Sequence, residues 1–251
     1  MNDTGLATDS INRFALHLYA QLKDGNGNIF CSPYSISTAL TMIFAGASSR
    51  TARQMEEVLS LPDKNKDVHA SFSALMNELN SPKYEDSYRL IATNALWGQQ
   101  GYAIRPEFIN VLKDRYFSEL NELDFKNDEA SRQIINKWVE KKTNDKIRDI
   151  IPRGVINDRT RLIIANAIYL KARWACEFEN KSTRDAAFHE TKQKKITVPL
   201  MNLESDFKYY ENDKIKLLEM PYLLNELSMF VILPREIDGL AEVERALSID
   251  D

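Results

Sequence analysis

Apolar positions near the start of the chain recur at the spacing of a helix. Ile11 and Phe14 begin a series of apolar residues that follow Ser10 three or four positions apart. This pattern predicts an amphipathic helix over residues 10–23 with Ser10 as its N-cap. The segment "DGNGN", residues 24–28, ends the pattern because glycine, asparagine and aspartate favour turns.

The next stretch, "NIFCSPYSISTALTMIFAGA", predicts a short apolar strand followed by a second helix. Ser32 is placed to cap this helix, and Pro33 suits its first position, where no backbone N–H is needed. Apolar side chains lie on nearly every face of the helix, so we expect it to be enclosed in the core. Two further helices are predicted, one opened by a capping box of Thr51 and Gln54 and one over residues 68–79.

Two apolar segments in the middle of the chain have matching sequences. Residues 90–96 are "LIATNAL" and residues 162–168 are "LIIANAI", so an asparagine stands at the same place in each, Asn94 and Asn166. Apolar runs of this length that are rich in β-branched residues predict strands. The match indicates equivalent positions in one sheet, and we expect the two strands to lie side by side.

Helices and strands alternate between and after these segments. The patterns predict a helix opened by Pro106, a strand over residues 119–125 and a long helix from about Ser131. From residue 207, three apolar strands at short spacing predict an antiparallel meander, and a short helix follows over residues 240–247. Strands joined by helical crossovers usually form a sheet with helices on its faces, so the predicted fold class is α+β.

Composition excludes some classes of partner. The 251 residues are 43% hydrophobic and 28% charged, as in a globular protein of one large or two small domains. A formal net charge of −4 makes nucleic acid and anionic membranes poor candidate partners. No run approaches the roughly 20 apolar residues of a membrane span. No signal peptide is visible, so an intracellular location is favoured over an extracellular one.

Catalytic and metal-binding patterns are absent from the sequence. No nucleophile elbow, dinucleotide fingerprint, phosphate loop or zinc-protease motif occurs, and the three histidines are expected at the surface or rim. Cys31 and Cys176 are expected to be buried free thiols. Ser32 and Ser35 stand near Cys31, but nothing in the sequence places a base beside them, so a hydrolase is a weak alternative. We expect no enzyme activity, metal or cofactor.

Several segments, taken together and in order, resemble signatures of the serpin family. The resemblance covers residues 10–249 and implies one serpin-like domain over residues 1–251, equivalent to the N-terminal two-thirds of the fold. It implies a large mixed sheet A with smaller sheets B and C, and about nine helices in the complete family. The segments are "NIFCSPYSISTALTMIFAGA", "TARQMEEVL", "ATNALWGQQGYAIRPEF", "INKWVEKKTNDKI", "TRLIIANAIYLKARW" and "LLEMPYLLNELSMFVILP".

The function that the resemblance implies is inhibition of an endopeptidase by a suicide trap. A target protease, of the serine class or alternatively the cysteine class, cleaves a reactive loop that then inserts into sheet A as an extra strand. Non-inhibitory serpins that act as carriers, chaperones or storage proteins are the alternative, since a fold does not determine a function. An inactive truncated fragment is a third possibility. Heparin activation is not expected, because residues 63–86 mix basic and acidic side chains.

Particular residues match functional positions of the family. The polar cluster at the place where sheet A parts corresponds to Ser32, Ser35 and Asn166, and Trp174 corresponds to the tryptophan at the top of the same strand, where the loop enters. Alternatively, Asn166 only bonds a neighbouring strand or a bulge. The reactive bond and the histidine that completes the cluster would lie beyond Asp251, so we expect the chain to be a fragment. Leu224 and Ala172 stand where the family commonly has glycine.

Overall fold

A computed structural model of the chain describes residues 4–25, 27–62, 67–81, 87–118 and 120–247. The backbone divides into two compact units, Met1–Ser81 with Leu90–Leu170, and Pro82–Arg89 with Lys171–Asp251. The prediction that heparin does not activate the protein was based on residues 63–86. Of these, residues 63–66 and 82–86 lie outside the described residues. None of the helices in the described ranges is both long enough and apolar enough to cross a bilayer.

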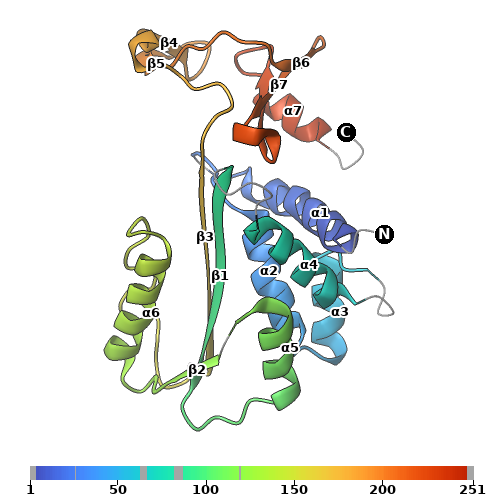
Figure 1. The fold of residues 1–251 in the computed structure, drawn as a ribbon, viewed down its shortest axis with the longest axis vertical. Coiled ribbons are helices and arrows are strands. Elements are labelled where there is room, and N and C mark those ends of the chain that lie inside the picture. The colour runs from blue at the N-terminus through green and yellow to red at the C-terminus, as the bar shows by residue number, and fades with distance from the viewer. Residues whose placement is uncertain (1–3, 26, 63–66, 82–86, 119, 248–251) are drawn as a thin grey trace. The chain divides into compact units, whose positions relative to one another are not determined.

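The first unit contains a mixed sheet with helices on both faces (Figure 1). The structure confirms the predicted helices over residues 68–79 and from Pro106, as well as the three predicted strands. Its helices are α1 (Gly5–Leu22), α2 (Pro33–Phe44), α3 (Ser49–Val58), α4 (Val68–Asn80), α5 (Pro106–Tyr116) and α6 (Asp128–Lys142). Its strands are β1 (Tyr88–Gln99), β2 (Leu120–Leu123) and β3 (Leu162–Ala172), in the order β2-β1-β3.

The two strands with matching sequences are neighbours, as predicted. β1 pairs with β2 in parallel, with Leu96 opposite Leu120. The backbone N–H of Gln99 donates to the carbonyl oxygen of Arg161, just before β3, at 2.9 Å. The side chains of Asn94 and Asn166 meet farther along the same pair of strands. Residue numbers in β1 therefore fall as those of the opposite residues at β3 rise, so β1 and β3 run antiparallel.

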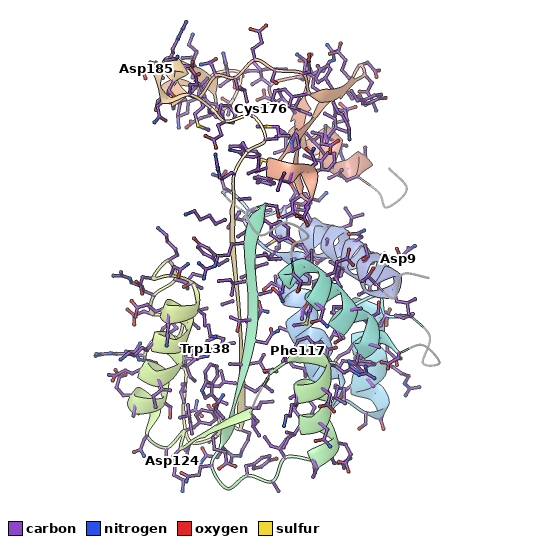
Figure 2. All side chains as sticks on the ribbon, in the orientation of Figure 1. Asp9, Phe117, Asp124, Trp138, Cys176 and Asp185 are labelled. Atoms are coloured by element: carbon purple, nitrogen blue, oxygen red, sulfur yellow. The ribbon has the colours of Figure 1, made fainter. Side chains whose placement is uncertain are left out.

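Alternation along the strands produces a hydrophobic core on each face of the sheet. Leu96 and Leu162 pack with side chains of α1, α2, α4 and α5. Ala95, Trp97 and Ala165 point the other way and pack with side chains of α6. Successive strand residues point to opposite faces, so both faces of β1 and β3 are covered. Trp138 lies on the sheet side of α6 (Figure 2), and its ring meets that of Trp97 edge-on at 5.3 Å.

The second unit is built from antiparallel strands. β4 (Arg184–His189) and β5 (Lys195–Leu200) form a hairpin that the apolar pattern did not predict. β6 (Lys208–Glu211), β7 (Ile215–Pro221) and β8 (Ser228–Pro234) form the predicted meander. The predicted last helix is present as α7 (Leu240–Ala246), and the short 3₁₀ turns are η1 (Asn180–Ser182) and η2 (Leu223–Asn225).

Three predicted helix starts are wrong. α1 begins at Gly5, so Ser10 is a buried residue inside the helix and not its cap. α3 begins after Ser48, and the side chain of its N-cap makes no cap hydrogen bond, so Thr51 does not open it. α6 begins at Asp128, before Ser131. In each case the helix starts earlier than the residue that the sequence pattern indicated.

The segment before α2 also differs from the prediction. Residues 28–31 form no strand, and Phe30 is fully exposed. Cys31 is exposed and Cys176 is only partly buried, so the prediction of two buried thiols is wrong. Along α2, Ile36 and Ile43 are exposed, so the helix is not enclosed on all sides. Strand formation needs a backbone partner, and none of the described residues pairs with 28–31.

Candidate functional site

The centre of the sheet in the first unit contains a pair of side-chain amides. Asn166 Nδ2 donates a hydrogen bond to Asn94 Oδ1 at 2.6 Å. Asn94 is 8% exposed and Asn166 is partly buried. Asn94 precedes Leu96 by two residues and Asn166 follows Ile164 by two, so both lie on the sheet face that α1, α2, α4 and α5 cover. Asn166 thus bonds its counterpart in the matching strand.

Asn94 retains an unused donor. Its Nδ2 is buried and has no hydrogen-bond partner among the described residues. Its backbone carbonyl accepts a hydrogen bond from the Ser118 hydroxyl at 3.2 Å, which holds β1 to the segment before β2. A buried polar group without a partner is costly, and such groups are few in native structures. The pair is consequently a polar centre with one donor still to be satisfied.

Ser32 and Ser35 are brought together at the start of α2. The Ser32 hydroxyl accepts a hydrogen bond from the backbone N–H of Ser35 at 3.3 Å, which confirms Ser32 as the N-cap. Ser35 is 7% exposed. No hydrogen bond joins either serine to Asn166, and no histidine bonds to either, within the part of the chain that the structure describes. Their chemistry is that of a helix cap, and nothing in this geometry activates them as nucleophiles.

Hydroxyl groups dominate the buried face of α2, a feature absent from the sequence predictions. Thr38 and Thr41 each donate from Oγ1 to the carbonyl four residues earlier, at 2.7 and 2.8 Å. The hydroxyls of Ser37 and Tyr34 are buried with no partner among the described residues. Burial raises the pKa of Tyr34 to about 12, so its hydroxyl remains protonated. The signal was present in the sequence as "SISTALT", whose hydroxyl residues recur three or four positions apart.

Trp174 lies in the second unit, where it is a packing anchor. Its ring stacks on that of Tyr222 with centroids 4.4 Å apart and planes inclined by 13°, and Phe178 meets it edge-on at 6.3 Å. Trp174 and Tyr222 also form an antiparallel bridge, and the Leu223 N–H donates to the Arg173 carbonyl at 2.7 Å. These contacts give Trp174 a packing role within the second unit. Its role in loop entry stays a prediction.

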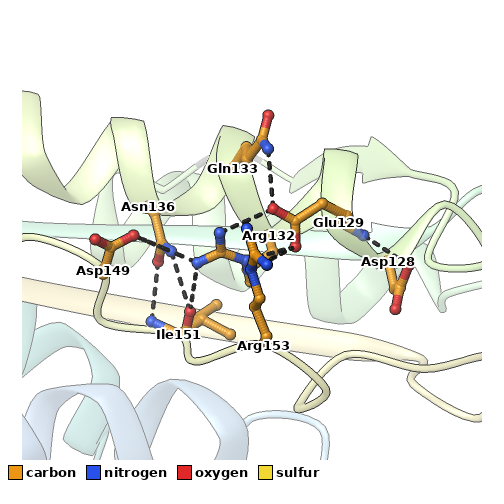
Figure 3. A network of polar contacts seen from close by, with 8 residues as sticks. All are labelled: Asp128, Glu129, Arg132, Gln133, Asn136, Asp149, Ile151 and Arg153. Carbon is orange, nitrogen blue, oxygen red and sulfur yellow. Dashed lines mark hydrogen bonds and ion pairs between the residues drawn. The ribbon is translucent and has the colours of Figure 1, made fainter.

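A polar network that no sequence pattern predicted joins α6 to the segment leading to β3 (Figure 3). The side chain of Asn136 binds both backbone groups of Ile151: Oδ1 accepts from the N–H at 2.9 Å and Nδ2 donates to the carbonyl at 3.1 Å. Arg132 Nη1 donates to the same carbonyl at 3.1 Å. We call these three residues the Ile151 clamp. The only sequence signal was a polar Asn136 at a position of the α6 pattern that faces the core.

The carboxylates of Glu129 and Asp149 orient the guanidinium of Arg132. Its Nε and Nη2 donate to the two carboxylate oxygens of Glu129 at 2.9 Å each, and Nη1 lies 3.3 Å from Asp149 Oδ1. The hydrogen bonds from Arg132 and then from Gln133 lower the pKa of Glu129 to about 2. Glu129 therefore stays ionised through the neutral range, and the paired guanidinium is oriented toward Ile151.

Metal and pocket chemistry add no second candidate of comparable detail. Across the described ranges, no three or more histidine, cysteine, aspartate or glutamate side chains gather where they could hold a metal ion. A cavity of about 520 Å³ lies between the meander and α7 and is lined by Tyr210, Ile232 and Val243. The amide pair and the Ile151 clamp are the most ordered polar features.

The profile of one family, described as serpin (serine protease inhibitor), matches residues 9–251. The chain belongs to the serpin family. An uncharacterized serpin-like protein of Thermococcus kodakarensis is 40% identical over 230 residues, 91% of this chain and 53% of the relative. The leukocyte elastase inhibitor of Sus scrofa is 38% identical over 247 residues, 95% of this chain and 65% of the relative.

Solved structures support the same assignment. The structure of ovalbumin from emu (Dromaius novaehollandiae) matches with a TM-score of 0.92 at 31% sequence identity, covering 98% of this serpin chain and 68% of the ovalbumin chain. The serpin-like fold that the sequence predicted is therefore confirmed. Serpins are a family of protease inhibitors and not of enzymes, in agreement with the expectation from the sequence. This chain spans 53% to 65% of the length of the Thermococcus and pig relatives.

Proposed function

We propose that this chain provides the sheet-forming part of an endopeptidase inhibitor that works by suicide trapping. In this mechanism a protease cleaves a reactive loop, and the loop inserts as a new strand into the sheet that contains β1 and β3. The reactive loop would be supplied by a segment that follows Asp251. The proposal is supported by family membership and by relatives named as leukocyte elastase inhibitors.

The observation that carries the proposal is the amide pair of Asn94 and Asn166. An insertable sheet must part and close again in the same register. A paired polar group inside an apolar layer favours one register, because any slip leaves a buried amide without a partner. An apolar pair would pack about as well in a slipped register and would specify the register less. The 2.6 Å bond between neighbouring strands has the chemistry that such a device needs.

The remaining predicted site residues have roles in the same proposal. Asn94 Nδ2 is the donor at which a further acceptor, such as the histidine expected in a later segment, would complete the polar cluster. Ser32 and Ser35, which the cap hydrogen bond joins at the start of α2, would belong to the same polar cluster. Trp174, stacked on Tyr222, would mark the point of loop entry.

The partner in this proposal is a protease. The serine class comes first because of the family description and the elastase inhibitors among the relatives, and the cysteine class is the alternative. Nucleic acid and anionic membranes are not proposed as partners, because the formal net charge is −4. Heparin is not proposed, because residues 63–86 mix basic and acidic side chains.

A chimera tests the proposal. We would continue Asp251 with the C-terminal part of the pig leukocyte elastase inhibitor and incubate the product with elastase, using the intact pig inhibitor as a positive control. The expected result is a covalent complex that survives denaturing electrophoresis. A chimera that unfolds cooperatively, yet is only cleaved as a substrate, would argue against trapping.

Substitution of Asn166 in the chimera tests the role of the amide pair. Asn166→Leu should change the number of inhibitor molecules consumed per protease inactivated, or the rate of polymerisation. The control is Lys171→Leu, an exposed position on the same strand. Unchanged stoichiometry and polymerisation for Asn166→Leu would leave the pair with a purely structural role.

A non-inhibitory serpin, acting as a carrier, chaperone or storage protein, is the second candidate function. The match to emu ovalbumin, which is not named as an inhibitor, favours it. Cleavage without trapping in the chimera experiment would support it. Unfolding of the 251-residue chain by itself tests whether residues 1–251 form the predicted single domain or an inactive fragment. One cooperative unfolding transition of a monomer would favour the single domain.

A further inference from the structure

His69 differs from the other histidines in its surroundings. Of the three in the sequence, His17 and His189 are exposed, as predicted, whereas His69 is partly buried in the first turn of α4. Its ring meets the ring of Tyr116 edge-on at 5.7 Å and lies 5.9 Å from that of Phe44. His69 therefore connects α4 with the last residue of α5 and with the end of α2.

A short hydrogen bond joins His69 to Tyr116. Nδ1 of the imidazole and the phenol oxygen are 2.6 Å apart, and this is the only hydrogen bond of the Tyr116 hydroxyl among the described residues. Tyr116 is 1% exposed. Burial, followed by the nearby charge of Asp67, raises the pKa of Tyr116 well above its ordinary value. The phenol thus keeps its proton. Because no other acceptor for this proton lies among the described residues, the hydroxyl donates to Nδ1 of a neutral imidazole that is protonated on Nε2.

Charged groups around His69 come from three elements. Burial has the largest effect and lowers the pKa of His69; Asp67, just before α4, raises it and Arg115 of α5 lowers it. Asp67 and Arg115 form an ion pair at 3.2 Å. Glu56 of α3 lines the same cavity as His69, whose volume is about 480 Å³, and α2 contributes the uncharged Phe44. Through this cavity His69 can exchange protons with solvent.

We propose that the bond between His69 and Tyr116 is an acid-sensitive link between α4 and α5. Protonation of Nδ1 turns the acceptor into a donor, and the phenol oxygen can then only accept from it. The buried Tyr116 hydroxyl then loses its acceptor, and it lies in the core cluster to which α1, α2, α4 and α5 all contribute. An unpaired buried donor is unfavourable, so the contact between the two helices weakens.

The direction of the pH effect follows from linkage. The folded state holds the proton of His69 less tightly than the unfolded state does, because burial lowers the pKa. The stabilising contribution of the neutral contact is complete above the ordinary histidine pKa of about 6.5. It is lost as the pH falls from that value through the lower pKa of the folded state. Mild acid should therefore loosen α4 and α5 before it affects the α6 face of the sheet.

The first test is NMR titration of the imidazole nitrogens in the full 251-residue chain, with signals assigned by His17→Asn and His189→Asn. We expect His69 to protonate at a lower pH than the other two histidines. Its neutral form should carry the proton on Nε2. Titration together with the other two, or a neutral form protonated on Nδ1, would overturn the proposal without any change to His69.

The second test is hydrogen exchange at pH 7.5 and 5.5, corrected for the intrinsic rate. Backbone amides of α4 and α5 should lose protection relative to those of α6 by up to about tenfold, because pH 5.5 lies one unit below the ordinary histidine pKa of about 6.5. His69→Asn keeps an acceptor that does not titrate and should abolish the loss, whereas His17→Asn should retain it. The proposal is wrong if wild-type protection is constant, or if His69→Asn lowers protection equally at both pH values.

Discussion

Removing the side-chain amide of Asn136 should destabilise the first unit and release the segment that leads to β3. Asn136 is 6% exposed and binds both the N–H and the carbonyl of Ile151. Ile151 itself packs against the core cluster on the α6 face of the sheet. In Asn136→Ala the N–H of Ile151 loses its partner, while the carbonyl keeps the hydrogen bond from Arg132.

The magnitude follows from these contacts. An unpaired buried N–H costs about 1–3 kcal/mol, and the loss of one of two bonds to the carbonyl costs about 1 kcal/mol. Alanine favours the helix over asparagine by roughly 0.5 kcal/mol, which offsets part of the loss. The expected decrease in the free energy of unfolding is therefore about 1.5–3.5 kcal/mol. For a protein of ordinary stability, about 5–15 kcal/mol, this is a large fraction.

Urea unfolding at 25 °C, followed by the fluorescence of Trp97 and Trp138, measures the change. Both rings lie on the α6 face of the sheet, so they report the affected region. Lys137→Ala, at the exposed next position of α6, is the control and should change the stability by less than about 0.5 kcal/mol. The amide of Ile151 should also exchange faster in Asn136→Ala. Equal stability of the two variants, with an unchanged Ile151 amide, would refute the account of the clamp.

Substitutions at three further residues test other features of the structure. Leu224 is 46% exposed and has φ at 65°, a left-handed conformation that strains the backbone of any residue with a Cβ atom. Leu224→Gly should therefore raise the free energy of unfolding by about 1 kcal/mol. A lower melting temperature for this variant would contradict the argument from strain. Ser32→Ala should lower the free energy of unfolding by about 1 kcal/mol and Ser32→Gly by only a few tenths if the serine is a cap, which urea unfolding of both variants decides. The hydrogen bonds from Arg132 and Gln133 lower the pKa of Glu129 from 4.5 to about 2, so its ion pair stabilises the protein above pH 4.5 and loses this effect as the pH falls toward 2. Glu129→Gln should flatten the curve of unfolding free energy against pH between 4.5 and 2. An unchanged curve would exclude the effect.

Elements with a strong local signal were predictable from the sequence. Pro106 opens α5, Asp67 caps α4 through a hydrogen bond to the Ala70 N–H at 2.9 Å, and the alternating strands of the meander pair in chain order. The amide pair was also accessible, because strands of matching sequence place Asn94 and Asn166 at equivalent positions. In these cases the residues that determine the structure are close together in the sequence, or repeat.

The start of α1 depended on a contact far along the chain. Thr4, the N-cap, makes no side-chain cap bond, but the Ala7 N–H donates to the hydroxyl of Ser71 in α4 at 3.0 Å. A helix capped by another helix has no local signature, which explains why the sequence pattern indicates Ser10 as the start. The β4–β5 hairpin was missed for a different reason. β4, "RDAAFH", shows no apolar alternation, and β5, "KITVPL", alternates but is short, mostly exposed and contains Pro199, which weakens a strand signal.

The buried polar groups of the first unit also show which contacts a sequence pattern can predict and which it cannot. Backbone alternation decides which face Asn94 and Asn166 share, so a sequence pattern is sufficient to bring them together. The partners of the remaining buried groups, the Asn94 Nδ2 donor and the Ser37 hydroxyl, depend on tertiary contacts that no periodicity encodes. Thr38 and Thr41 avoid this dependence because each bonds to a carbonyl of its own helix. A polar residue in a core is therefore predictable when its partner is local or repeated. Where neither holds, as for the donor of Asn94, the unmatched atom indicates where a further partner must bind.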